Sequence, residues 1–166
     1  MSDGSLIEVD VLVEADLWST FPPAEDLVVQ AVIAACRTAA ADLPDGTEIA
    51  VMLTDDEGIR ALNRDWRGKD KATNVLSFPT PEIARQGGDP HLGDIAIAYE
   101  TLAREAEEEG KPLAHHLLHL AVHGTLHLIG HDHEDGEEAE GMEALERVIL
   151  AALDVPDPYA ETEPLR

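Results

Sequence analysis

The feature that most constrains this chain is the histidine spacing in residues 123–133, which read HGTLHLIGHDH. His123 and His127 are four residues apart, so on a helix their side chains lie on one face in adjacent turns. Gly130 is the kind of residue that ends a helix in a left-handed conformation, and the chain can then bring His133 back to the same point. Three imidazoles that leave a fourth position open are the ligand set of a catalytic zinc site.

The histidine stripe on this segment is longer than one metal ion can use. His115, His119, His123 and His127 repeat every four residues, and each step of four drifts about 40° around a helix. Only neighbouring pairs can therefore share an ion. Because His133 follows the helix end, it returns most easily to the last two turns, which selects His123 and His127. His119 is then a group that supports the ligands, or a surface residue.

Three neutral imidazoles predict one Zn²⁺, with nickel, cobalt and copper as alternatives that also prefer nitrogen ligands. The bland alternative is a set of exposed histidines without a metal. The spacing also occurs in metzincin proteases, where a glutamate follows the first histidine and takes a proton from water. Gly124 occupies that position here, so a zinc metalloprotease is the less favoured hypothesis.

The hydrophobic pattern predicts an α+β (α/β-like) fold: a single domain, residues 1–166, with loose ends at about 1–5 and 157–166. A four-stranded mixed sheet is expected to pack with about five helices, one of them a metzincin-like histidine helix. The expected strands are 6–14, 48–54, 73–78 and 93–98, the last two forming an antiparallel pair around a polar loop at 79–90. The expected helices are 23–42, 55–66, 100–109, 112–129 and 137–153. The inner stripe of the last helix is Met142, Leu145, Ile149 and Leu153.

The charge distribution is uneven. The net charge of −24 argues against a nucleic-acid partner, because a phosphate backbone repels an acidic surface. Five of the 11 basic residues nevertheless fall between positions 60 and 71. They are Arg60, Arg64, Arg67, Lys69 and Lys71. This basic segment is either a solvated helix face or a local site for an anionic ligand.

Several features predict a cytoplasmic location. The first residues contain no basic and apolar signal pattern, and no apolar run is long enough to span a membrane, so we expect no membrane association. Cys36 is the single cysteine, which fits a reducing compartment.

Four sequence blocks together resemble the YbeY endoribonucleases, a family of rRNA maturation factors. The blocks are LNRDWRGKD at 62–70, TNVLSFP at 73–79, LGDIAI at 92–97 and the histidine segment at 123–133. The resemblance implies a metal-dependent, single-strand-specific endoribonuclease that acts in 3′-end maturation of small-subunit rRNA and in ribosome quality control. The implied partners are single-stranded RNA, the small ribosomal subunit and a ribosome-associated GTPase. The family's zinc ligands fall on His123, His127 and His133, and its functional arginine falls on Arg67.

The roles of the remaining polar residues stay open. Arg67 has the geometry to bind a phosphate bidentately, or it forms a salt bridge with a neighbouring aspartate. Arg60, Arg64, Lys69 and Lys71 would track the RNA backbone without reading its sequence. Asp132 and Asp94 are candidates for a general base or for orienting an imidazole. The nucleophile is either water or the RNA 2′-hydroxyl. A non-catalytic ribosome-assembly factor containing zinc is the main alternative function.

Overall fold

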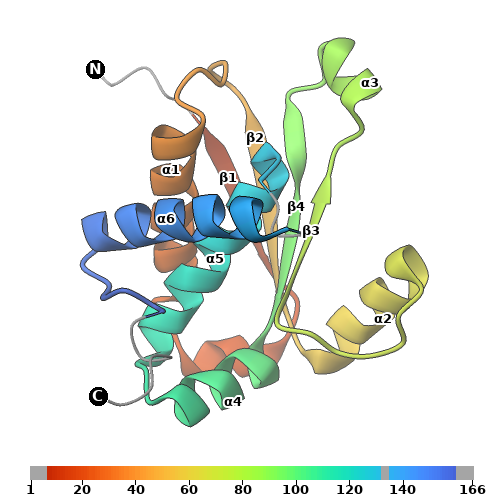
Figure 1. Ribbon diagram of the computed structural model, residues 1–166. Coiled ribbons are helices and arrows are strands. Elements are labelled where there is room, and N and C mark those ends of the chain that lie inside the picture. Colours follow the sequence, from red (N-terminus) through yellow and green to blue (C-terminus); the bar gives the residue numbers. More distant parts are fainter. Residues whose placement is uncertain (1–6, 132–134, 160–166) are drawn as a thin grey trace.

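A four-stranded mixed sheet organises the molecule (Figure 1). The computed structural model describes residues 7–131 and 135–159. The sheet order is β1-β2-β4-β3, in which β1, β2 and β4 are parallel and β3 is antiparallel to β4. The strands are β1 (Glu8–Val13), β2 (Glu48–Thr54), β3 (Val75–Pro79) and β4 (His91–Ala98). This topology places β1 at one edge of the sheet and β3 at the other.

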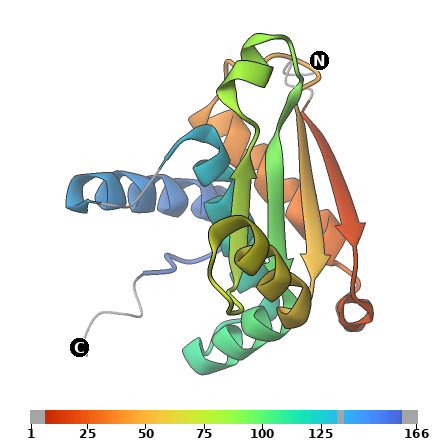
Figure 2. The same ribbon diagram turned by 90° about the vertical axis from the view of Figure 1, so that its right-hand side faces the viewer.

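The two faces of the sheet are covered unequally (Figure 2). The helices are a 3₁₀ turn (Asp16–Thr20), α1 (Ala24–Ala39), α2 (Asp56–Arg67), α3 (Glu82–Gln86), α4 (Tyr99–Glu109), α5 (Leu113–Ile129) and α6 (Gly136–Ala152). Helices α1, α5 and α6 lie on one face, and α2 lies on the other. Within the described ranges, no helix combines the length and apolar character needed to cross a membrane.

The predicted α+β class, the four-stranded mixed sheet and the antiparallel pair of β3 and β4 are confirmed. The described residues contain six α-helices, where about five were expected. The additional helix is α3, which lies in the stretch predicted to be a loop. It has five residues and buries none of them, so it carries no apolar periodicity that a sequence pattern can reveal.

Helix α5 is the central helix of the core and contacts α1, α4, α6, β3 and β4. Leu117 and Leu126 on this helix are fully buried. Gly124 allows the helix to lie close to the sheet, because a Cβ atom there would lie 3.0 Å from Ile95 Cγ2 and 3.3 Å from Val75 Cγ2. The helix ends at Gly130, whose φ of 116° is the left-handed cap expected for glycine. Gly124 therefore lets the histidine helix pack closely on β3 and β4, and Gly130 determines where it ends.

Candidate metal centre

Two of the three predicted metal ligands converge on one point. His123 and His127 lie on adjacent turns of α5, and their Nε2 atoms are 3.2 Å apart. Two Zn–N bonds of about 2.0–2.1 Å at a tetrahedral angle place their nitrogens about 3.3 Å apart. The donor atoms and their spacing therefore fit a single ion. The third predicted ligand, His133, lies outside the described residues, as does Asp132.

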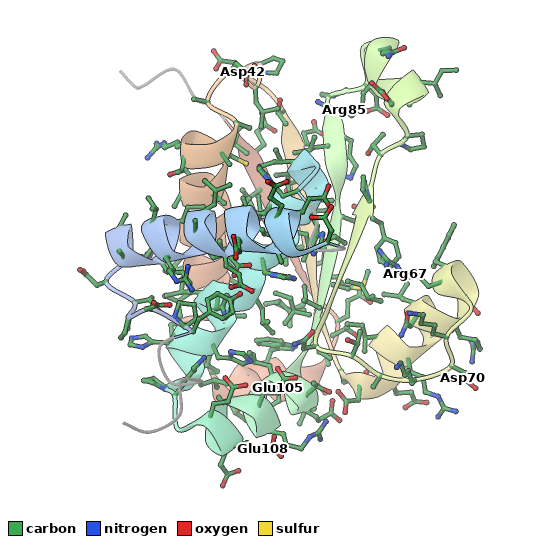
Figure 3. All side chains as sticks on the ribbon, in the orientation of Figure 1. Asp42, Arg67, Asp70, Arg85, Glu105 and Glu108 are labelled. Carbon is green, nitrogen blue, oxygen red and sulfur yellow. The ribbon has the colours of Figure 1, made fainter. Side chains whose placement is uncertain are left out.

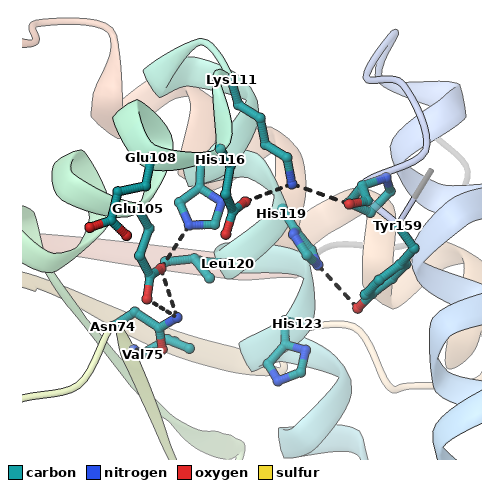
Figure 4. A pocket seen from close by; sticks show the side chains of 12 residues that line it. Asn74, Val75, Glu105, Glu108, Lys111, His116, His119, Leu120, His123 and Tyr159 are labelled. Carbon is teal, nitrogen blue, oxygen red and sulfur yellow. Dashed lines mark hydrogen bonds and ion pairs between the residues drawn. The ribbon is translucent and has the colours of Figure 1, made fainter. Parts of the chain in front are cut away.

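The other ring nitrogen of His123 faces a buried carboxylate. Glu146 of α6 has no exposed surface, and its Oε2 atom accepts a hydrogen bond from His123 Nδ1 at 2.5 Å. Its Oε1 atom accepts from His119 Nε2 at 3.2 Å and from the hydroxyl of Tyr159. Figure 4 shows His119 and Tyr159 facing one another, with His123 one turn further along α5.

The electrostatics of this cluster keep the carboxylate ionised. Burial by itself raises the pKa of Glu146, but the hydrogen bonds from His119 and His123 outweigh burial and hold that pKa well below its usual range. Burial and the neighbouring Glu146 carboxylate raise the pKa of Tyr159 well above its ordinary value. The phenol therefore remains protonated and donates to the carboxylate.

A second set of side chains, His119, His123 and Glu146, also has the composition of a metal site. One ligand atom each from His119, His123 and Glu146 lie within 4.8 Å of one another, so these three residues have the composition and spacing to hold a metal ion. His123 belongs both to this group and to the pair with His127. Glu146 lies at the Nδ1 side of the His123 ring, and His127 lies at the Nε2 side.

The histidine pair and the basic segment meet in one pocket of about 730 Å³. Arg67 and Lys69 lie in its wall together with His123 and His127. The remaining lining residues are Asn74, Val75, Leu76, Ser77, Pro79, Gly130 and His131. The fold thus brings a cationic side chain, an edge strand and two convergent imidazoles to one hollow, although they are about 60 residues apart in sequence.

Arg67 is directed toward β3 and away from Asp70 (Figure 3). Its Nη2 atom donates to the Ser77 carbonyl oxygen at 2.6 Å, and its guanidinium lies 5.5 Å from the centre of the Phe78 ring. The aspartates are used by other arginines, since Arg60 pairs with Asp70 and Arg64 pairs with Asp65. A salt bridge is therefore not what positions Arg67.

The remaining predicted site residues are dispersed. Arg60 and Arg64 are exposed on α2, Lys71 is exposed after it, and none of the three lines the pocket of the histidine pair. Asp94 is exposed on β4 and bonds His91 Nε2 at 2.8 Å. It belongs to the α2 side of the sheet because neighbouring strand residues point to opposite faces, so the structure does not bring it to the histidines. His119 does join them, through Glu146.

Sequence reasoning missed Glu146 and Tyr159. Glu146 follows Met142 by four residues and precedes Ile149 by three, so it lies within the inner stripe of an apolar helix. A charged residue in such a stripe is a signal that a buried partner exists. Tyr159 reaches the cluster from the segment after α6, and its local sequence has no pattern that predicts this contact.

The fold and this cluster define a class: an α+β domain with a histidine helix packed on its sheet and a histidine–carboxylate group of metal-binding composition. Residues 22–154 match the family model described as Endoribonuclease YbeY. The chain belongs to the YbeY endoribonuclease family. Proteins named "Endoribonuclease YbeY" from Bradyrhizobium sp. (strain BTAi1) and Rhodopseudomonas palustris (strain BisB5) are 56% and 55% identical to it. The alignments cover 99% of both chains in the first case, and 98% of this chain and 87% of the relative in the second.

A solved structure shares the fold. The solution structure of TM1509 from Thermotoga maritima aligns with a TM-score of 0.52 at 22% identity. The alignment covers 95% of this chain and 99% of that one. The mixed sheet and its helices are therefore an architecture that also occurs in an experimental structure.

Proposed function

We propose that this chain is a metal-dependent endoribonuclease that cleaves single-stranded RNA at the pocket formed by α5, β3 and the end of α2. In this proposal His123, His127 and His133 hold one Zn²⁺, and Arg67 binds the phosphate that is cleaved. The observation that carries the proposal is the 3.2 Å approach of the His123 and His127 Nε2 atoms in the wall of a pocket that Arg67 also lines. The names of the similar proteins support the reaction class.

The chemistry needs positive charge near the phosphate and a group that activates the nucleophile. His123, His127 and His133 would hold the ion, which would supply Lewis acidity toward the phosphate and the attacking group. Arg67 has five N–H donors, of which Nη2 contributes one to Ser77. The others suit a phosphate because a planar guanidinium matches two phosphate oxygens at once. Lys69, in the same pocket wall, adds charge for the adjoining backbone.

We propose single-stranded RNA as the substrate of this pocket. The pocket includes residues of the edge strand β3, and Arg67 and Lys69 in its wall would contact the phosphate backbone without base specificity. We propose maturation of the 3′ end of small-subunit rRNA and ribosome quality control as the biological role. The corresponding partners are the small ribosomal subunit and a ribosome-associated GTPase. The acidic remainder of the surface suits contact with basic ribosomal proteins.

Peptide hydrolysis is disfavoured by the packing around position 124. Gly124 is buried, and its carbonyl oxygen accepts a hydrogen bond from Ser77 Oγ at 2.8 Å. Even a Cβ atom at this position would lie 3.0 Å from Ile95 Cγ2 and 3.2 Å from Ser77 Oγ, so a glutamate would have to displace these neighbours. The residue that supplies the proteolytic base in metzincins is therefore absent, and its place is filled by the sheet.

A cleavage assay with end analysis tests the proposal. We expect the protein to cut a labelled single-stranded RNA and to leave a duplex of the same sequence intact. A chelator should abolish cleavage, and added Zn²⁺ should restore it. Products ending in a 2′,3′-cyclic phosphate would identify the RNA 2′-hydroxyl as nucleophile, whereas a linear phosphate would identify water. Zinc binding without cleavage would favour the non-catalytic assembly factor, and casein hydrolysis would favour the protease.

A further inference from the structure

We propose that Glu146 is a positioning residue that fixes the His123 imidazole with its Nδ1 protonated and its Nε2 directed at the metal ion. Tyr159 and His119 hold the carboxylate in place for this task. The inference rests on the proposed metal site and adds the residues that orient one of its ligands.

The first step is the location of the carboxylate. Glu146 is fully buried on the inner face of α6, opposite the histidine face of α5. An unpaired carboxylate in such a place would strongly destabilise the folded state. Both of its oxygens are used, Oε2 by His123 and Oε1 by His119 and Tyr159. The Glu146 carboxylate lies in the apolar stripe of α6 and accepts hydrogen bonds from three donors.

The second step is the proton on His123. An ionised carboxylate only accepts hydrogen bonds, so the 2.5 Å contact with Glu146 Oε2 places the proton on His123 Nδ1. With Nδ1 engaged by Glu146, Nε2 is the ring nitrogen left to bind a metal ion. That atom lies 3.2 Å from His127 Nε2, so it faces the place where the ion is expected. A carboxylate behind a ligating imidazole also makes the imidazole a stronger ligand.

The third step distinguishes positioning from ligation. Glu146 contacts the Nδ1 side of the His123 ring, whereas His127 faces the Nε2 side. The two nitrogens of one imidazole point in different directions. An ion bound to the Nε2 atoms of His123 and His127 therefore lies on the other side of the His123 ring from Glu146, and Glu146 cannot be its ligand. Glu146 can be a ligand only if a second ion binds among His119, His123 and Glu146. Metal stoichiometry separates these two arrangements.

The fourth step is the support for Glu146. Tyr159 belongs to the segment after α6, which is tied back at several points. Arg147 donates to Asp157 at 3.1 Å and stacks 5.3 Å from the Tyr159 ring centre. Lys111 donates to the Pro158 carbonyl oxygen at 3.2 Å (Figure 4). These contacts position the Tyr159 hydroxyl on Glu146, so the C-terminal segment contributes indirectly to the orientation of His123.

The test compares Glu146→Gln with Glu143→Gln. Glutamine keeps the size and one acceptor oxygen of Glu146 but removes the charge. Glu143 is a matched control because it lies one turn earlier on α6, is partly exposed, and forms a 3.9 Å ion pair with Arg147 instead of a contact with His123. Zinc affinity is measured by competition with a chromogenic chelator, zinc content by elemental analysis, and the His123 tautomer by ¹⁵N NMR of the imidazoles. None of these measurements requires RNA.

We expect the wild type to bind one zinc per chain, with His123 protonated at Nδ1. Glu146→Gln should bind zinc about 10- to 100-fold more weakly, as for other carboxylates that support a ligating histidine. It should also lose the uniform Nδ1–H tautomer, whereas Glu143→Gln should match the wild type. Tyr159→Phe should show a smaller loss of affinity.

Unchanged zinc affinity in a folded Glu146→Gln protein would overturn the proposal. Two zinc ions in the wild type, one of them lost in this variant, would overturn it as well, because Glu146 would then be a ligand. If the wild type binds zinc with this dependence on Glu146 but cleaves no RNA, the proposed function fails and the positioning role stands.

Discussion

Ser77 links Arg67 to the helix that carries the histidines. The Ser77 carbonyl oxygen lies 2.6 Å from Arg67 Nη2, and the Ser77 hydroxyl donates to the Gly124 carbonyl oxygen at 2.8 Å. Gly124 is the neighbour of His123, so one residue of the edge strand β3 holds the guanidinium at a fixed place relative to the candidate metal ligand. The arginine is thus placed by main-chain geometry, which suits a group that must meet a phosphate in one orientation.

Replacement of Arg67 by alanine should reduce cleavage of single-stranded RNA by about 100-fold or more, because a charged donor to the transition state is lost. Zinc content and the thermal unfolding midpoint should remain near the wild-type values, since Arg67 lies at the surface end of α2. Cleavage rates under single-turnover conditions provide the measurement. Wild-type cleavage by this variant would assign Arg67 a structural role.

Arg64→Ala is the matched control for that experiment. Arg64 is exposed one turn earlier on α2 and pairs with Asp65 at 2.9 Å, outside the pocket. We expect at most a few-fold weakening of RNA binding that diminishes at high salt, with the cleavage rate of bound RNA unchanged.

Gly93→Ala should destabilise the fold by about 2 kcal/mol or more. A Cβ atom at Gly93 would lie 2.5 Å from Leu128 Cδ2 and 2.7 Å from the Phe78 carbonyl oxygen. Helix α5 and the β3 backbone would therefore both have to move away from β4. Denaturant unfolding gives the free energy. An unchanged midpoint would mean that α5 does not lie this close to the sheet.

Gly141→Ala is a control for which we expect the opposite change in stability. Gly141 is exposed inside α6, and a Cβ atom there has no neighbour within 4 Å. Because alanine has a higher helix propensity than glycine, we expect this change to stabilise the protein by about 0.5–1 kcal/mol.

The histidine pair was predictable from local spacing, whereas its support was not. His123 and His127 are separated by one helical turn, and Gly130 has the positive φ that its position after the helix predicts. Glu146 and Tyr159 reach the same centre through tertiary packing of α6 and the segment after it. No pattern within a single element encodes those contacts, although a glutamate in an apolar stripe marks a position that requires a partner.

The basic segment shows the same limit. Its five basic residues were predicted to be either a solvated helix face or a site for an anionic ligand, and of the three arginines only Arg67, at the end of α2, extends to β3. Arg60 and Arg64 are paired with aspartates at the surface. The difference depends on where α2 ends relative to the sheet, which is a property of the assembled fold. Asp94 was likewise a candidate by sequence position, and strand alternation directs it to the face opposite α5.

Protonation of His116 should lower the free energy of unfolding in acid. His116 is buried and bonds Glu105 Oε1 at 2.9 Å. Burial lowers its pKa, and the opposing effect of Glu105 does not cancel this. The unfolded chain therefore binds a proton on His116 at a higher pH than the folded chain does. The contribution of neutral His116 to the free energy of unfolding is present above about pH 6.5 and is lost as the pH falls.

Comparison with His116→Gln isolates this contribution, because glutamine can still donate to Glu105. We expect the free-energy difference between wild type and variant to be constant above about pH 7 and to shift against the wild type between pH 6.5 and 5. The measurement is denaturant unfolding at each pH. A shift in favour of the wild type at low pH would mean that His116 is charged in the folded protein.

The most direct test of the central claim is to measure zinc content and RNA cleavage on the same preparations of wild type, His127→Ala and His115→Ala. His115 lies on the same helix, three turns earlier, and is not among the residues lining the pocket of the histidine pair. Wild type and His115→Ala should each hold one zinc per chain and cleave single-stranded RNA. His127→Ala should lose most of the zinc and most of the cleavage together. Full zinc content and full cleavage in His127→Ala would contradict a catalytic ion held by His123 and His127.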